Sequence, residues 1–152
     1  MKIFSHEKKA PFISFNIEKD IKTQDVFEAA QRGDPEAQYI VGLAYNNEKL
    51  YSDSAEWYLK AAVQGNAKAQ FNLANKYYEG KGVEQNFEEA FKWYKKAAEQ
   101  GHSQAQFNLG CMYGRGEGVK KNYSKANQWI QKAAQQENLE AQKLLKILGS
   151  LL

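Results

Sequence analysis

The sequence predicts an all-α protein, a short right-handed α-solenoid of stacked antiparallel helix hairpins with three repeats between two flanking half repeats. Two observations support this fold class. The chain of 152 residues is similar to itself at a spacing of 36 residues, and fixed spacings of this size are typical of repeat architectures. Each copy also holds two stretches with helical periodicity around a glycine-containing turn. One such hairpin cannot bury both of its apolar faces, whereas a stack of hairpins can.

The repeats divide the chain into two parts. Residues 69–104 match residues 105–140 at 16 of 36 positions, and a shorter copy, 37–68, lacks four residues between Tyr45 and Tyr51. We therefore expect a solenoid over residues 23–152, with repeats 37–68, 69–104 and 105–140 and a terminal helix 141–152. Residues 1–22 form an N-terminal extension that we expect to pack on the solenoid or on a partner.

Each full repeat is expected to contain a helix A followed by a helix B. In the second repeat the apolar residues from Ala69 to Tyr77 fall on one side of a helix, and those from Phe87 to Ala98 do the same. Helix A should begin at an N-cap, and three candidates precede it: Asp34, Asn66 and Asn138. The core between hairpins should be filled by the alanine pairs of helix B and by one tryptophan per repeat: Trp57, Trp93 and Trp129.

The turns are expected to differ between repeats. Gly114-x-Gly116-x-Gly118 follows a helix rather than a strand, so it predicts a left-handed turn between helices and not a phosphate-binding loop. The first repeat lacks this glycine pattern, so its turn between helices A and B should be different. The third repeat has Glu137 where the others have glycine, which leaves open the conformation of the turn that follows this repeat.

Several spaced residues recur together. The pattern is Ala-x-x-x-Leu-(Gly/Ala)-x-x-Tyr, then Gly-x-Gly-Val, then Ala-x-x-Trp-x-x-Lys-Ala-Ala-x-x-Gly, carried by Ala69 to Gly101 and again by Ala105 to Ala134. It resembles the Sel-one-like repeat, a relative of the tetratricopeptide repeat, over residues 24–152. Secreted members of that family often have paired cysteines, and this chain resembles the cysteine-poor members because Cys111 is its only cysteine.

The sequence offers no convincing catalytic or metal site, so we expect no enzyme activity, no cofactor and no metal. The two histidines, His6 and His102, lie in a tail and a turn, and one cysteine provides neither a disulfide nor a thiolate zinc site. Ser5-x-x-Lys8 matches a β-lactamase spacing without the motifs that accompany it. The single cysteine and the absence of a secretory pattern predict a cytoplasmic location.

Composition and charge restrict the partners. The chain is 43% hydrophobic and 26% charged, with no apolar run long enough for a membrane span. Its net charge of +3 has both signs interleaved, which gives no support for a nucleic acid partner. We therefore expect a protein or peptide partner, and neither nucleic acid nor membrane.

Positions that differ between repeats are free to contact such a partner. On helix A the arc opposite the apolar face contains the positions three, six, seven and ten residues after the leading alanine. Because A helices line the concave side of solenoids of this kind, we expect one groove there. The candidate partner-binding residues are Ile40, Leu43, Asn47, Asn72, Asn75, Lys76, Glu79, Asn108, Met112 and Arg115.

Two sets of amides have alternative interpretations. Asn72 and Asn108 recur on the exposed arc, so they either hold a ligand's backbone or carboxylate, as in related tetratricopeptide domains, or simply descend from a duplication. By contrast, four glutamines lie within the apolar arc and should be buried, bonding to the backbone or to each other: Gln38, Gln70, Gln106 and Gln142.

The favoured function is a non-catalytic interaction module that binds a protein or peptide in the groove. The alternative is a cytoplasmic inhibitor, such as an immunity protein that masks a bacterial toxin, and the third option is a β-lactamase-like enzyme dependent on Ser5. Residues 11–17 alternate apolar and polar side chains like an extended segment, and the last helix is rich in leucine. Either segment could cap the solenoid or mediate a homodimer.

Overall fold

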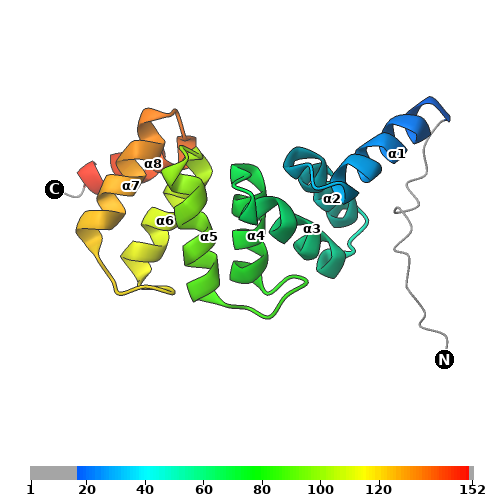
Figure 1. Cartoon of the computed structure of the whole chain (residues 1–152). Coiled ribbons are helices and arrows are strands. Elements are labelled where there is room, and N and C mark those ends of the chain that lie inside the picture. Colours follow the sequence, from blue (N-terminus) through cyan, green and yellow to red (C-terminus); the bar gives the residue numbers. More distant parts are fainter. Residues whose placement is uncertain (1–16, 151–152) are drawn as a thin grey trace.

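The computed structural model describes residues 17–150, with side chains from residue 24 onward, and this part folds into eight α-helices. Figure 1 shows them following one another in a row from one end of the molecule to the other. Their bounds are α1 (Ile17–Gln31), α2 (Pro35–Asn47), α3 (Tyr51–Val63), α4 (Ala67–Glu79), α5 (Phe87–Glu99), α6 (Ser103–Arg115), α7 (Tyr123–Gln135) and α8 (Leu139–Ser150).

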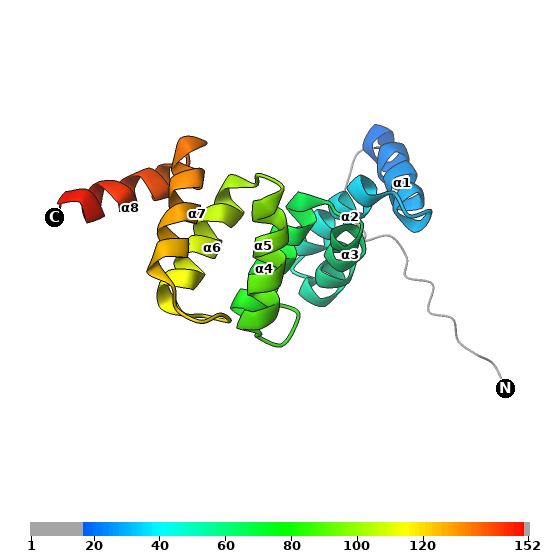
Figure 2. The same ribbon diagram turned by 60° about the vertical axis from the view of Figure 1, so that its left-hand side comes forward.

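The helices form the predicted α-solenoid. The three hairpins are α2–α3, α4–α5 and α6–α7, and each helix packs chiefly against its neighbours in the chain. Helix α1 occupies the place of a helix B and α8 that of a helix A, and the described residues contain no partner helix for either of them. Figure 2 shows α8 extending from α7 at the end of the stack. None of the helices described is both long and apolar enough to cross a membrane.

The N-terminal end differs from the expectation. Helix α1 begins at Ile17, before the expected solenoid boundary at residue 23. Ile17 is therefore the first residue of a helix and not part of an extended segment. Residues 11–16, which carry the rest of that expectation, lie outside the described residues.

The predicted N-caps are confirmed. The Oδ1 atoms of Asp34, Asn66 and Asn138 accept hydrogen bonds of 2.7, 2.9 and 2.9 Å from the backbone N–H three residues later. Helix α6 has a cap that the sequence analysis missed, because Nδ1 of His102 accepts from the backbone N–H of Ala105 at 3.2 Å. Burial lowers the pKa of His102, which keeps its imidazole neutral and able to accept.

The turns between helices A and B depend on glycine. Gly82 and Gly118 have φ angles of 83° and 65°. A Cβ on Gly118 would lie 2.2 Å from the backbone oxygen of Phe87, and one on Gly82 would lie 2.3 Å from the backbone of Tyr51. Each loop therefore touches the start of the preceding helix B, and only glycine allows this approach. The left-handed turn predicted for the third repeat is confirmed, and the second repeat has a turn of the same kind.

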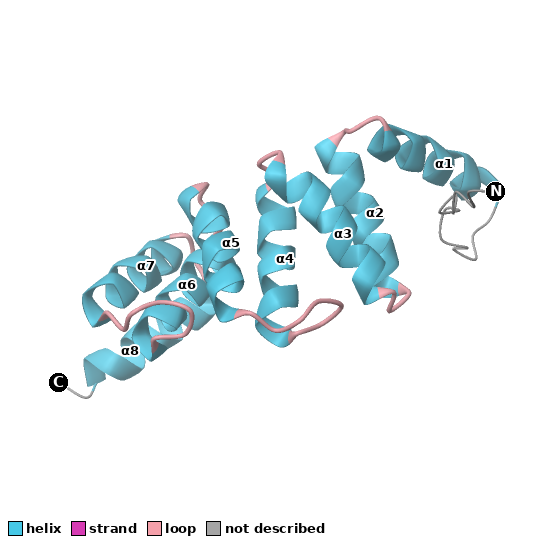
Figure 3. Ribbon diagram, turned by 60° about the horizontal axis from the view of Figure 1, so that its bottom comes forward, coloured by secondary structure: helices cyan, strands magenta, loops and turns pink. Residues whose placement is uncertain are grey.

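The first repeat has a different turn, as expected. Residues 48–50 replace the longer loops 80–86 and 116–122, which stand out in Figure 3, and Lys49 adopts a φ of 61°.

The turn that follows the third repeat has the same shape as the turns that follow the other repeats. Glu137 has a φ of 62°, and its N–H bonds to the carbonyl of Ala134 at 3.1 Å, as Gly101 does to Ala98 at 3.0 Å. A left-handed glutamate thus takes the place of glycine.

The predicted core is largely confirmed. Trp57 and Trp93 are buried, with exposed fractions of 5% and 4%, among the alanine pairs of the B helices. Trp129 is only half-buried, although it packs against the hydrophobic cluster that contains Trp93. The ring of Phe27 lies 5.8 Å from that of Trp57. The equivalent position in α5 is Lys95, which offers Trp129 no comparable ring.

The glutamines of the A helices link successive hairpins. The Nε2 atoms of Gln38, Gln70 and Gln106 donate to carbonyl oxygens at the end of the preceding helix B at 3.1, 3.0 and 3.1 Å. The Oε1 atom of each accepts a 2.8 Å hydrogen bond from a second glutamine, at the end of its own helix B: Gln64, Gln100 and Gln136. The predicted burial and hydrogen bonding of these three glutamines are confirmed.

Gln142 differs from the other three. It donates to the carbonyl of Ala134 at 3.1 Å, but its side chain is exposed, so the predicted burial is wrong there. The described part of the chain contains no helix B after α8 that could cover Gln142 or supply a second glutamine.

We predict that Gly118→Ala destabilises the protein more than Gly101→Ala. Both positions are left-handed, which costs alanine about 1–2 kcal/mol, but a Cβ on Gly101 meets nothing within 4 Å. The overlap with Phe87 should add roughly 2 kcal/mol for Gly118. Denaturant unfolding of the two full-length variants measures the difference, and equal losses would show that the loop does not depend on its contact with α5.

We also predict that Gln70→Ala lowers the free energy of unfolding by about 1–3 kcal/mol, because a buried carbonyl and the Gln100 amide lose their partner. The matched control is Gln142→Ala, which removes the equivalent but exposed side chain and should cost less than about 1 kcal/mol. Urea titrations compare them. A loss for Gln142→Ala as large as that for Gln70→Ala would contradict this role of burial.

Candidate functional site

Two adjoining hollows lie on the face formed by the A helices α2, α4 and α6. We call them the α2–α4 hollow and the α4–α6 hollow, and their volumes are about 240 Å³ and about 260 Å³. They share Asn75 and Glu79 of helix α4, so they adjoin along this helix. Tyr58 of α3 and Tyr94 of α5 contribute to the lining from the B helices.

The α2–α4 hollow is polar and carries charge. Its lining combines amides, two lysines, one carboxylate, a tyrosine and a leucine: Leu43, Asn46, Tyr58, Asn72, Asn75, Lys76, Glu79 and Lys81.

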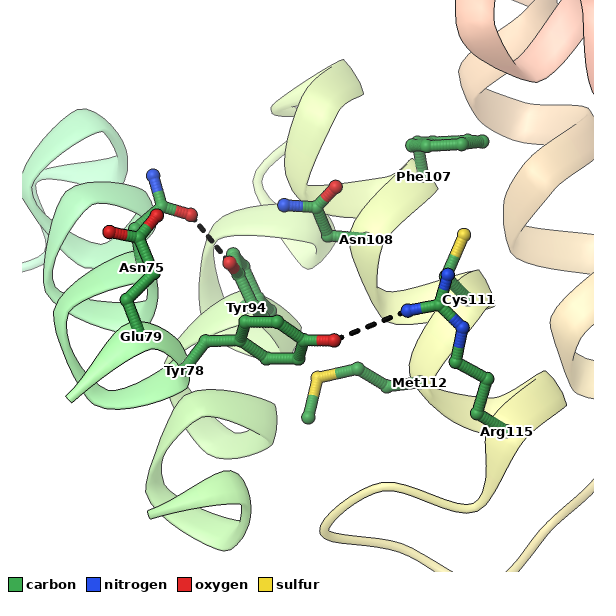
Figure 4. A pocket seen from close by; sticks show the side chains of 9 residues that line it. All are labelled: Asn75, Tyr78, Glu79, Tyr94, Phe107, Asn108, Cys111, Met112 and Arg115. Atoms are coloured by element: carbon green, nitrogen blue, oxygen red, sulfur yellow. Dashed lines mark hydrogen bonds between the residues drawn. The ribbon is translucent and has the colours of Figure 1, made fainter. Parts of the chain in front are cut away.

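The α4–α6 hollow is more mixed, as Figure 4 shows. It is lined by Asn75, Tyr78, Glu79, Tyr94, Phe107, Asn108, Cys111, Met112 and Arg115. The Tyr78 hydroxyl accepts from Arg115 at 3.2 Å and donates to a carboxylate oxygen of Glu117 at 2.9 Å, so this chain of contacts joins α4 to the end of α6.

Eight of the ten candidate residues line these hollows, namely Leu43, Asn72, Asn75, Lys76, Glu79, Asn108, Met112 and Arg115. Ile40, which is 43% exposed, and Asn47, at the end of α2, line neither hollow. The structure thus brings most of the predicted set together, and its role in binding a partner stays a prediction.

The expected exposure is wrong at one position of the repeat. Met112 is 1% and Lys76 is 5% exposed, although both lie on the arc expected to face solvent. The seventh residue after the leading alanine is only about 20° from that alanine on the helical wheel. It therefore turns toward the neighbouring hairpin, whereas the tenth residue is exposed, the third is exposed or half-buried, and the sixth is half-buried.

Tyrosines of the B helices are the lining residues that sequence reasoning missed. Tyr58 and Tyr94 stand at the same position of successive repeats, which is the signal that could have revealed them. The hydroxyl of Tyr94 donates to Oδ1 of Asn75 at 2.5 Å. Burial raises the pKa of both tyrosines, so both hydroxyls stay protonated and able to donate at neutral pH.

The recurring asparagines lie against these tyrosines. Hydrogen bonding from Asn72 partly counters the effect of burial on the pKa of Tyr58, and Asn108 does the same for Tyr94. Each asparagine comes from the helix A that follows the tyrosine's repeat. This placement gives a structural reason for their recurrence that neither of the two sequence interpretations included, and whether they also hold a ligand stays a prediction.

Lys76 and Cys111 have perturbed pKa values. Burial lowers the pKa of Lys76 and the charge of Lys81 lowers it further, while Glu79 acts in the opposite direction. Burial raises the pKa of the Cys111 thiol, which keeps it in the weakly nucleophilic protonated form. Among the described residues, no group of three or more His, Cys, Asp or Glu is arranged to hold a metal ion.

Three solved structures show what the chain is similar to. It is 38% identical to c5321, a protective antigen of uropathogenic Escherichia coli with an SLR fold, with a TM-score of 0.75 over 79% of this chain and 27% of that one. The chain thus spans about a quarter of that protein. A Sel1 repeat protein from Oxalobacter formigenes is 34% identical, with a TM-score of 0.76 over 82% of this chain and 97% of that one.

The third structure shares the fold at lower identity. Helicobacter pylori cysteine rich protein B is 22% identical, with a TM-score of 0.66 over 85% of this chain and 97% of that one. A comparison with curated proteins gives no match.

The family of the chain follows from its repeats. The Sel1 repeat matches residues 35–66, 67–102 and 103–138, which places each repeat two residues earlier than our division and covers α2 to α7. Together with the likeness to the Oxalobacter formigenes protein, this shows that the chain belongs to the Sel1 repeat family.

Proposed function

We propose that the protein is a non-catalytic interaction module that binds an extended peptide segment of another protein across α2, α4 and α6. The Sel1 repeat fold commonly mediates protein–protein interaction and is generally a scaffold without catalytic activity. The observation that carries the proposal is the pair of adjoining hollows, lined mainly by side chains that differ between repeats.

The lining chemistry supports an extended peptide. Amides, hydroxyls and charged groups along the two hollows could pair with the backbone groups and side chains of a strand-like segment. Helix α2 adds the exposed Ile40 and the half-buried Leu43 at one end of this face. A peptide lying across three helices would thus meet apolar, polar and then mixed surfaces.

Two further parts of the proposal concern location and self-association. The single cysteine supports action in a reducing compartment such as the cytoplasm. On helix α8, Ile147 and Leu148 are 58% and 47% exposed. This apolar surface supports a homodimer through the C-terminal helix as a secondary mode of interaction.

The test compares two double variants in affinity capture from a native lysate of the source organism. Ile40→Glu with Arg115→Glu alters exposed side chains on the proposed face. Leu59→Glu with Lys95→Glu is the matched control, because Leu59 is 40% exposed against 43% for Ile40, Lys95 is an exposed cation in one ion pair like Arg115, and neither control residue lines a hollow. We expect the first variant to lose at least about tenfold of the captured partner, since tenfold corresponds to about 1.4 kcal/mol.

The control variant should capture as much partner as the wild type, and both variants should keep the wild-type melting temperature within a few degrees. Equal capture by the two variants, or no protein captured by the wild type, would reject the proposed face.

A further inference from the structure

The α2–α4 hollow contains a buried cation without an ionic partner among the described residues. Lys76 is 5% exposed. Its Nζ donates to Oδ1 of Asn46 and lies 4.5 Å from the centroid of the Tyr51 ring. No carboxylate of the described residues forms an ion pair with it. Lysine is almost never this deeply buried without such a pair.

A second cation increases the positive charge of the same hollow. Nζ of Lys81 lies 4.3 Å from the centroid of the same Tyr51 ring, and Lys81 also lines the hollow. The only acidic residue in the lining is Glu79, whose side chain is exposed. Its effect on the pKa of Lys76 is smaller than that of burial and of Lys81 together. An anionic group entering the hollow would therefore meet an excess of positive charge.

The stack itself does not require a lysine at this position. The equivalent residues of the first and third repeats are Ala44 and Met112, and Met112 fits the same place with 1% exposure. A buried ammonium costs free energy that an apolar side chain would not. The second repeat thus bears this cost where the neighbouring repeats avoid it, and a bound anion would offset it.

Neutral donors and apolar surface adjoin the cation. Asn72 and Asn75 line the hollow, and Asn75 uses Oδ1 to accept from Tyr94, which leaves its Nδ2 to donate to a ligand. Leu43 lines the side toward α2, close in the chain to the exposed Ile40. This combination suits a carboxylate with an apolar residue beside it.

We propose that the α2–α4 hollow binds an aspartate or glutamate side chain of the peptide, with the Lys76 ammonium as ionic partner and asparagine amides as further donors. An apolar residue next to that acid packs on Leu43 and Ile40. This inference rests on the proposed function and gives the chemistry of its partner.

The experiment selects peptides from a phage-displayed random library on the immobilised full-length protein. These peptides have no free C-terminus, so any carboxylate they offer comes from a side chain. We expect selected peptides to share an acidic residue beside an apolar one. Replacing that acid by its amide should weaken binding about tenfold in fluorescence anisotropy, because a charge-assisted contact is lost.

Variants of helix α4 then locate the contact. Lys76→Met introduces the residue that the third repeat has, so it should fold as well as the wild type and weaken the acidic peptide about tenfold. The amide peptide should bind the Lys76→Met variant no more weakly than the acidic peptide does. The two changes are not additive because they remove the two sides of the same contact. The matched control is Lys68→Met, an exposed lysine at the start of the same helix, which should leave binding unchanged.

The outcomes separate the two proposals. The inference is wrong, and the peptide-binding function stands, if the selected peptides lack a common acid. The same holds if replacing the acid by its amide weakens binding to the Lys76→Met variant as much as it weakens binding to the wild type. If the wild type selects no peptide, peptide binding fails and the inference fails with it.

Discussion

The buried glutamine near the start of each helix A is the contact on which the stack depends. Its amide donates to the end of one hairpin and accepts from the end of its own, so it fixes the spacing of hairpins at a point that water does not reach. The bond recurs with nearly the same length at Gln38, Gln70 and Gln106. Because this glutamine contact joins each hairpin to the preceding helix B in the same way, helices α2, α4 and α6 lie on one face of the stack.

The stack determines which positions remain for function. Alanines, glutamines and tryptophans recur because each hairpin must fit the next, and the glycine loops meet the preceding helix B at its first turn. Positions that vary make up most of the lining of the two hollows, and Asn75 and Glu79 line both of them. Lys76 belongs to both groups, because its position lies in the packed part of the stack while its ammonium reaches a hollow.

Much of the fold was predictable because several local signals agreed with the repeat. The N-caps, the glycine turns and the buried glutamines each follow from residue type and register, as Asn66, Gly118 and Gln70 show. The burial of Lys76 and Met112 was missed, because their position was assigned to the outward arc although it lies only about 20° from the buried leading alanine on the helical wheel. The cap from His102 was missed because histidine is a less typical capping residue than asparagine.

The candidate site was predictable in part. Helix A residues were found from the variation between repeats, which selects Asn75 and Glu79 without any structural information. The tyrosines of the B helices, Tyr58 and Tyr94, escaped because they repeat and therefore read as core residues. Their rings are indeed buried, while hydrogen bonds of their hydroxyls connect them with asparagines of the A helices. A contact between two elements of this kind is visible only when the helices are placed in space.

Hydrogen exchange of the glutamine side-chain amides, followed by NMR on the full chain, tests most directly whether the buried glutamines hold the hairpins together. We expect the Nε2 protons of Gln38, Gln70 and Gln106 to exchange slowly, and those of the exposed Gln142, which keeps one hydrogen bond, to exchange much faster. Equally fast exchange at all four glutamines would contradict the account, because the hairpins would then be held together by other contacts.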